Sequence, residues 1–433
     1  MNEIIIKAKD LDKNEVFSGG VEYSSPARGK WTIAHLSMLI PHSHQIYIGA
    51  ICCLRGVVLS AAEFNGLDRY SMIHIKDFDM VDTSMEGFII DGVTDILSNL
   101  KEIPPCVLLY TTCIHHFVAC DMNLVFRTLR ERFPKVDFVD CYMTPTMRKK
   151  VAPDDLMRSQ LYAALGVKEK NPKQINIIGN CYAKSHDSEL YTLLEKNGYT
   201  IKDICTCKTY QEYKSMAESS LNLYMLPQAT LAVQKLEKRL NQKSIYIPQV
   251  YTFDKIEQNL ILLSSSLNLT ESIDIEGLKQ KAKDKIEQTK KILSDVPIAI
   301  DYTATNKHVN LARLLLENNF NVFRIYTDVI HPEENDDLNW IKNNYPDLEF
   351  SPTIDYRCRF INSLSRKSTD KKIAIGQKAA YFLNTEHFVN LIEDSDLSGF
   401  DGICRLCDLL IDAFNNKKDM RNLIQVKAWG CEA

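Results

Sequence analysis

Strand-like and helix-like patterns of apolar residues alternate along most of the chain. In the first third, runs of β-branched and aromatic residues predict strands at 45–51, 106–112 and 136–143. Between the last two runs, the apolar residues of "MNLVFRTLRERF" recur at spacings of one, three or four, which predicts a helix over 122–133. Strands that alternate with helices in this way are typical of parallel α/β units.

The same alternation continues through the middle and last thirds. "INIIGN" (175–180) and "LNLYML" (221–226) indicate strands of a second sheet, and "VPIAIDYT" (296–303) opens a third. The lysine- and glutamate-rich segment 276–295 predicts one long solvated helix that links the second domain to the third. We therefore expect an α/β protein of three Rossmann-like domains, each a mostly parallel sheet flanked by helices. The expected domains are residues 1–168, 169–294 and 295–433.

Composition and charge limit the classes of protein to which the chain could belong. With 45% hydrophobic and 25% charged residues, the chain of 433 residues has the composition of a soluble globular protein. Its net charge of −4 comes from acids and bases mixed along the sequence, which argues against nucleic-acid and membrane partners. The first residues do not resemble a secretory signal, and no stretch of about 18 apolar residues could span a bilayer. We therefore expect a cytoplasmic protein, whose thirteen cysteines stay reduced.

Two groups of cysteines follow predicted strands. Cys52 and Cys53 come directly after the strand at 45–51, and Cys113 comes directly after the strand at 106–112. Ligands of open parallel sheets bind outside the carboxyl ends of the strands. A thiol at the start of a helix also meets backbone amides that stabilise a thiolate. From position alone, Cys113 is either a packed thiol or part of a site.

Other motifs carry less information. "SSPARGKW" (24–31) has Ser24 and Trp31 where a phosphate loop needs a glycine and a hydroxyl side chain, and no GxGxxG or HExxH is present. We therefore expect no nucleotide bound by this chain. "CRLC" (404–407) lies in an amphipathic helix and "CTC" (205–207) ends a strand, so core packing is favoured for both. His115 and His116 are adjacent, about 100° apart at a helix start, which disfavours a zinc site on this pair.

Several stretches, in order, resemble the component 1 superfamily of nitrogenase. This superfamily comprises the molybdenum-iron protein subunits, their cofactor-assembly scaffolds, and the light-independent protochlorophyllide and chlorin reductases. The stretches that carry the resemblance are "SSPARGKWTIAHLSMLIPHSHQIYIGAICCLRGVV", "LLYTTCIHHFVACDM", "INIIGNCYAKSHDSELYTLLEKNGY", "LNLYML" and "IAIGQKAAYFLNTEHF". The resemblance covers nearly the whole chain. Any single motif is loose, whereas the ordered series is fairly specific.

The resemblance implies two cluster ligands in this chain. Cys53 falls on the second cluster cysteine of the family, with Cys52 as its competitor, and Cys113 falls on the third. Where the first family cysteine is expected, the chain has Tyr23, Ser24 and Ser25. Ser24 and Cys120 are therefore possible substitute ligands.

The cofactor cysteine of catalytic nitrogenase is also missing. That cysteine follows the strand that matches "LNLYML", and Leu226 and Pro227 occupy the region here. Without a soft ligand, an iron-molybdenum cofactor bound in the nitrogenase manner is not expected, so dinitrogen is not the expected substrate.

The implied function is that of a nitrogenase-like reductase subunit. Cys53 and Cys113 from each of two chains would hold one [4Fe–4S] cluster at the interface of a homodimer, or of a heterodimer with a paralogue. Electrons would come from a separate ATP-dependent reductase of the nitrogenase iron-protein type and pass to a small-molecule substrate. The basic residues that could orient substrate or deliver protons are Arg28, Arg55, His115, Lys378 and His387.

Two other hypotheses stay open. The chain could be a non-catalytic scaffold that binds an iron-sulfur precursor and transfers it, which the two missing ligands favour slightly. It could instead be a metal-free binding protein on the same fold, whose cysteines are packed thiols.

Overall fold

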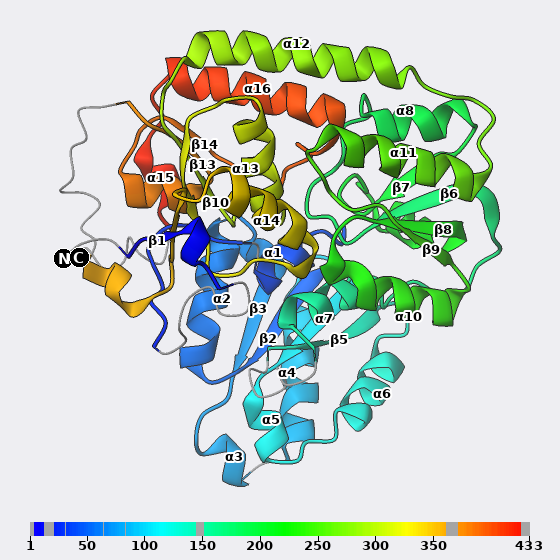
Figure 1. The fold of residues 1–433 in the computed structure, drawn as a ribbon. Helices are drawn as coiled ribbons and strands as arrows, with labels where there is room; N and C mark the ends of the chain where they lie inside the picture. The colour runs from blue at the N-terminus through cyan, green and yellow to red at the C-terminus, as the bar shows by residue number, and fades with distance from the viewer. Residues whose placement is uncertain are drawn as a thin grey trace. The chain divides into compact units, whose positions relative to one another are not determined.

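The computed structural model describes residues 4–12, 21–30, 32–63, 65–82, 84–143, 151–360 and 371–425 (Figure 1). Contacts between residues divide the chain into two compact units. Unit 1 consists of Met1–Lys30, Lys184–Asn197 and Pro248–Ala433, and unit 2 consists of Trp31–Ala183 and Gly198–Ile247. The domain boundaries expected from the sequence stay a prediction.

The first sheet lies in unit 2 and has the strand order β3-β2-β4-β5, with every pair parallel. Its strands are β2 (His44–Gly49), β3 (Tyr70–His74), β4 (Cys106–Thr111) and β5 (Asp137–Tyr142). The accompanying helices are α1 (Ile33–Ser37), α2 (Ile51–Glu63), α3 (Asp79–Asp82), α4 (Met85–Asn99), α5 (Cys113–Phe117), α6 (Met122–Arg132) and α7 (Pro153–Gln160). The strands and the helix predicted from the first third of the sequence are thereby confirmed.

Apolar side chains cover both faces of this sheet. On β4, Val107 and Leu109 join the core cluster that contains residues of α4 and α6, whereas Leu108 and Tyr110 join the cluster that contains residues of α1 and α2. Successive strand residues point to opposite faces. A strand that is apolar at successive positions therefore needs helices on both sides, as parallel sheets generally do.

The second sheet also lies in unit 2 and has the parallel order β7-β6-β8-β9. Its strands are β6 (Asn171–Ile178), β7 (Thr200–Asp203), β8 (Ser219–Tyr224) and β9 (Lys243–Tyr246). Two helices of unit 2 accompany it, α9 (Tyr210–Ser215) and α10 (Thr230–Leu240). Cys205 and Cys207 pack against the apolar core here, as expected for packed thiols.

The third sheet lies in unit 1 and has the order β1-β12-β11-β10-β13-β14, with β1 antiparallel at one edge. Its strands are β1 (Ile6–Lys7), β10 (Ile298–Asp301), β11 (Val322–Tyr326), β12 (Glu349–Ser351), β13 (Ile373–Ile375) and β14 (Phe388–Val389). The helices of this unit are α8 (Glu189–Lys196), α11 (Phe253–Leu267), α12 (Ile275–Leu293), α13 (His308–Glu317), α14 (Asn335–Asn344), α15 (Gln377–Leu383) and α16 (Gly399–Asn415).

The charged helix α12 is amphipathic rather than fully solvated. It runs beside α16 in unit 1 (Figure 1), and Ala282, Ile286 and Leu293 on one of its faces are buried. The lysine and glutamate residues between these positions conceal the apolar stripe in the composition. α12 therefore helps to form the core of its unit, and "CRLC" lies on the partner helix α16, where Cys407 is buried.

In each sheet, the chain first adds strands on one side of a central strand and then continues on its other side. The place where this change occurs is called the switch point. These switch points lie between β2 and β4, between β6 and β8, and between β10 and β13. The connections that leave the two central strands diverge there, which opens a crevice at their carboxyl ends. The strand order therefore marks one expected ligand position in each sheet.

Two further expectations concern the described residues as a whole. All cysteines among them are free thiols, as predicted. In the same ranges, no helix has both the length and the apolar character needed to cross a bilayer. A cytoplasmic location stays a prediction.

The packing of Gly49 leads to a stability prediction for unit 2. A Cβ at Gly49 would lie 2.4 Å from Cγ2 and 2.7 Å from Oγ1 of Thr112. We expect Gly49→Ala to lower the free energy of unfolding by about 1–3 kcal/mol, measured by urea denaturation. Adding Thr112→Ala removes both clashing atoms and should restore most of the loss. Gly166→Ala, which has no atom within 4 Å of its new Cβ, is the control and should change little.

Candidate functional site

Three cysteines lie at the switch point of the first sheet. Cys52 and Cys53 are in the first turn of α2, which follows β2, and Cys113 is the first residue of α5, which follows β4. β2 and β4 are neighbours in the sheet. The close packing of Gly49 on Thr112 brings the two strand exits together, because any larger side chain at Gly49 would separate them. The backbone of Gly49 thus packs against the Thr112 side chain directly before α2 and α5 begin.

The three thiols share one electrostatic environment. The Sγ atoms of Cys52 and Cys53 lie 4.0 Å apart. Burial raises the pKa of Cys53, and interactions with the Cys52 and Cys113 thiols raise it further. A thiolate at Cys53 is therefore disfavoured unless a cation lies beside it. A metal ion or an iron-sulfur cluster supplies such a positive charge.

Large apolar side chains are exposed beside these thiols. Ile51 precedes Cys52 and is 53% exposed, and Phe117 at the end of α5 is 78% exposed. Cys52 and Cys53 are exposed as well, whereas Cys113 is partly buried. Each group of thiols thus has one large exposed apolar side chain close to it in the sequence.

One chain supplies only part of a ligand set. Within the described ranges, no three or more histidine, cysteine, aspartate or glutamate side chains are arranged to hold a metal ion. A [4Fe–4S] cluster takes four protein ligands, usually thiolates. The donor chemistry of Cys53 and Cys113 fits such a cluster, and the number of ligands fits when two copies contribute.

The two substitute ligands lie in other surroundings. Cys120 comes after α5, and its Sγ lies 3.8 Å from Sδ of Met122. Burial, and then the charge of Glu86, raises the pKa of Cys120 to about 12. The residues that act on Cys120 are therefore Met122 of α6, Glu86 of α4 and Asp121, rather than Cys53 or Cys113. Ser24 is exposed and belongs to unit 1.

His115 follows Cys113 by two residues, as Arg55 follows Cys53. Its side chain is buried, and its ring packs 4.1 Å from that of His116. Burial, and then the charge of His116, lowers the pKa of His115 to about 4. The imidazole is therefore neutral at pH 7, and its Nδ1 has no hydrogen-bond partner among the described residues. Arg55 is exposed on α2.

Lys378 and Arg28 lie in unit 1, on segments that touch. Lys378 Nζ donates to the Tyr302 hydroxyl and to Thr353 Oγ1, each at 3.0 Å. Its Cε is 3.9 Å from the position that a Cβ at Gly29 would take, and Arg28 is the preceding residue. Arg28 Nε is buried and finds no hydrogen-bond partner in the described part of the chain.

His387 lies at the other end of the third sheet. It precedes β14, whereas Lys378 follows β13, so the two residues flank opposite ends of neighbouring parallel strands. His387 Nδ1 is 2.8 Å from the backbone oxygen of Ala413. This contact joins the strand to α16, and the structure does not bring His387 to Lys378.

The sequence pattern does not single out Tyr302, which contacts Lys378, or Lys30 and His308, which lie beside the Tyr302 ring. Lys30 Nζ lies 5.6 Å from the centre of that ring, and the rings of Tyr302 and His308 are 6.5 Å apart. The strand predicted at 296–303 includes Tyr302, whereas β10 ends at Asp301, so Tyr302 directly follows its strand as Cys113 follows β4.

Comparison with known proteins identifies the fold. A family model described as nitrogenase component 1 type oxidoreductase matches residues 35–358, more than half of the chain. A solved structure described as "Nitrogenase Cp1 at pH 6.5" is similar with a TM-score of 0.65 and 14% identity, over 93% of this chain and 95% of that chain. "Nitrogenase Cp1 at pH 5" is similar with a TM-score of 0.62 and 14% identity, over 95% and 93%. At this identity the structures support the fold alone, and they confirm the expected fold class. No curated protein matches the sequence.

The shared environment of the thiols predicts how Cys53 titrates. Because the Cys52 thiol raises the pKa of Cys53, Cys52→Ser should lower it, although burial keeps it above the value of a free cysteine. Alkylation of Cys53 by iodoacetamide should therefore rise with pH at a lower midpoint in the variant. Cys120→Ser is the control, because Cys120 is not among the groups that shift Cys53. An unchanged midpoint in Cys52→Ser would contradict the interaction.

Proposed function

Because the chain belongs to the nitrogenase component 1 type oxidoreductase family, we propose that it is a reductase subunit that holds an iron-sulfur cluster at a subunit interface. The observation that carries the proposal is the group of thiols on α2 and α5 at one switch point. Cys53 and Cys113 from each of two chains bind one [4Fe–4S] cluster, with Cys52, Ser24 or Cys120 as possible substitutes. The partner chain is a second copy or a paralogue.

The residues around the thiols would set the properties of the cluster. When bound, the cluster supplies one-electron transfer. Ile51 and Phe117, which are exposed in one chain, would exclude water from the interface. Lower polarity around a cluster changes its reduction potential, and burial protects it from solvent. The chain would thus contribute ligands, burial and orientation, while the redox chemistry belongs to the cofactor.

The electron donor would be a separate protein. The sequence contains no phosphate loop, so ATP hydrolysis would reside in a reductase of the nitrogenase iron-protein type. The acceptor would be a small molecule other than dinitrogen, because the buried apolar Leu226 follows β8 where a soft cofactor ligand is needed. Arg28, Arg55, His115, Lys378 and His387 remain candidates for binding it or moving protons.

One observation also supports a scaffold that transfers a cluster. Cys52 and Cys53 are exposed in the single chain, and exposed thiols exchange ligands more readily than buried ones. Catalytic turnover with a reduced partner and ATP distinguishes a reductase from a scaffold. A metal-free binding protein on the same fold would contain no iron after anaerobic reconstitution.

Iron content tests the ligand assignment. After anaerobic reconstitution, we expect about four irons per dimer and an EPR signal of a reduced [4Fe–4S] cluster after dithionite. Cys53→Ser and Cys113→Ser should each reduce the iron content to less than about one per dimer, because each substitution removes two ligands from a shared site. Cys404→Ser on α16 is the matched control. Full iron content and an unchanged spectrum in Cys113→Ser would exclude the proposed ligand set.

ATP dependence tests the proposed electron donor. A nitrogenase-type iron protein should reduce the reconstituted cluster in the presence of MgATP and not with a non-hydrolysable analogue. The loss of visible absorbance of the oxidised cluster reports the reaction, and dithionite alone gives the full amplitude. Equal rates with and without ATP would mean that the chain does not use this kind of donor.

A further inference from the structure

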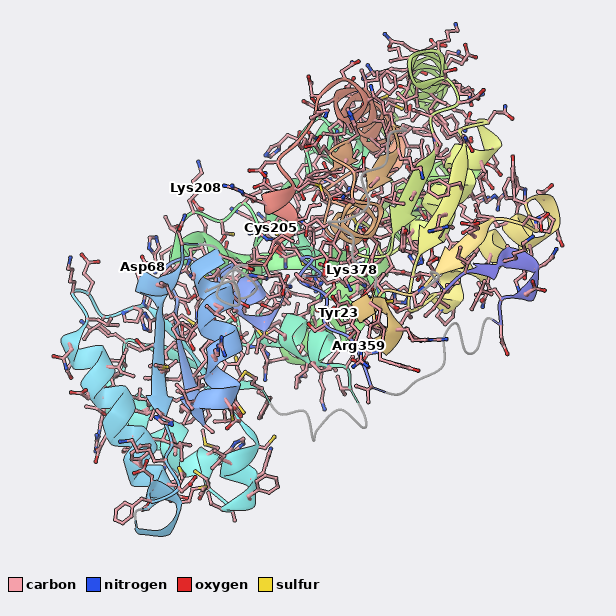
Figure 2. The ribbon with its side chains drawn as sticks, turned by 90° about the vertical axis from the view of Figure 1, so that its left-hand side faces the viewer. Tyr23, Asp68, Cys205, Lys208, Arg359 and Lys378 are labelled. Atoms are coloured by element: carbon pink, nitrogen blue, oxygen red, sulfur yellow. The ribbon has the colours of Figure 1, made fainter. Side chains whose placement is uncertain are left out.

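Basic side chains gather at the switch point of the third sheet. The loop after β10 begins with Tyr302 and ends at Lys307. On the other side of the switch, Lys378, which is labelled in Figure 2, follows β13. β10 and β13 are parallel neighbours. Gly376 adopts φ +104°, and a Cβ there would lie 2.3 Å from Oδ2 of Asp301. This turn begins α15 directly beside the end of β10, which places Lys378 beside Tyr302.

Two ammonium groups approach the same phenol ring. Lys378 Nζ and Lys30 Nζ lie 5.0 and 5.6 Å from the centre of the Tyr302 ring. Lys378 is largely buried, and its two hydrogen-bond partners are neutral hydroxyl groups. Lys30 donates to Oδ1 of Asn306 at 2.8 Å. An ammonium has three N–H donors, so Lys378 keeps one for a further acceptor.

Two carboxylates lie near Lys378 without forming an ion pair with it. Asp301 accepts from the backbone N–H groups of Thr303 and Ala379. Burial raises the pKa of Asp301, whereas these hydrogen bonds and then the charge of Lys378 lower it. Asp328 accepts from the backbone N–H and from Oγ1 of Thr353, and the same Oγ1 accepts from Lys378. No ion pair of Lys378 with another described residue is present.

The acids on the other side of the loop are also engaged. Glu333 forms an ion pair with Lys307, whose side chain is buried. Glu334 is fully buried, and burial raises its pKa to about 8, so it is mostly protonated at pH 7. Its Oε1 accepts from the first turn of α13. Lys30 and Lys378 thus both lie beside the Tyr302 ring, while Glu333 is paired with Lys307.

The pKa values of two histidines are affected by the charge of Lys30. His331 is partly buried, and burial, followed by the charges of Lys30 and Lys307, lowers its pKa to about 4. His308 is fully buried, and neither of its ring nitrogens has a hydrogen-bond partner among the described residues. Burial lowers the pKa of His308, and then the charges of His331 and Lys30 lower it further. Both imidazoles are neutral at pH 7.

We propose that this group, defined by Lys30, Tyr302, Lys307, His331 and Lys378, binds an oxyanion of the small-molecule substrate. The ligand chemistry is a carboxylate or phosphate oxygen that accepts hydrogen bonds from Lys378 and Lys30. The inference rests on the proposed function, because it names the class of substrate that the reductase would act on. All five residues belong to unit 1. The site is thus defined without the cluster cysteines, which belong to unit 2.

Calorimetry with two probes tests the inference in the full-length protein. Inorganic phosphate and succinate are titrated separately at constant ionic strength, which removes general salt effects. Binding of phosphate alone indicates a phosphorylated substrate, and binding of succinate alone indicates a carboxylate. Lys378→Gln should weaken binding at least about tenfold, because a charge-assisted hydrogen bond is lost. Lys378→Arg should retain most of the affinity.

Lys371→Gln is the matched control. Lys371 also lies in unit 1, but its Nζ donates to the backbone oxygen of Phe414 and is exposed, so affinity should not change. The inference is overturned if wild-type protein binds neither probe, or if Lys378→Gln binds as tightly as wild type. A second readout is the NMR titration of the His331 ring. A bound anion should raise the pKa of His331, because it offsets the nearby lysine charges.

The two proposals fail separately. Oxyanion binding is measured on protein without iron, and iron content is measured on Lys378→Gln as well as on the cysteine variants. If the protein binds iron at full content but binds no oxyanion, only the assignment of the substrate class is wrong. If the protein binds an oxyanion but contains no iron after reconstitution, the reductase proposal is wrong and the chain is an anion-binding protein.

Discussion

The order of strands in a parallel sheet decides which side chains can meet, and the rest of this molecule depends on that constraint. In each sheet, two strands distant in sequence are neighbours at the switch point. Their exits lie about 5 Å apart, the spacing of paired strands, so residues that follow them share one crevice. The first sheet places thiols there, and the third places ammonium groups.

The two groups are complementary in their chemistry. Burial raises the pKa of Cys53, and the neighbouring Cys52 and Cys113 thiols raise it further. Burial lowers the pKa of His308 and of His331, and the charge of Lys30 lowers both further. Like charges held together by a fold cost free energy unless a ligand of opposite charge binds. The proposed occupants follow this rule, since the thiols would take a cationic cluster and the lysines an anionic ligand.

Local patterns in the sequence predict the elements and part of the site. The strands before Cys53 and Cys113 are recognisable because runs of β-branched and aromatic residues are visible in the local sequence. The cysteines come directly after these strands, so their position can be predicted too. The group around Lys378 is not predictable in that way. Lys30, Tyr302 and Lys378 are far apart in sequence, and they meet only because β13 pairs with β10 and the residue 21–30 segment packs on α15. The composition of α12 is similarly uninformative, since three buried apolar residues are hidden among many charges.

The path of the chain between the two units has a consequence for its biogenesis. The chain passes from one unit to the other after Lys30, Ala183, Asn197 and Ile247. β6 and β7 belong to unit 2, but α8 between them belongs to unit 1. Neither unit is a continuous segment of the gene, so neither can be excised as a fragment by truncation at either end. The sheet of unit 1 joins distant segments, because Ile6 of β1 pairs with Phe350 of β12. That edge of the sheet therefore cannot form until residues as far along the chain as Phe350 have been synthesised.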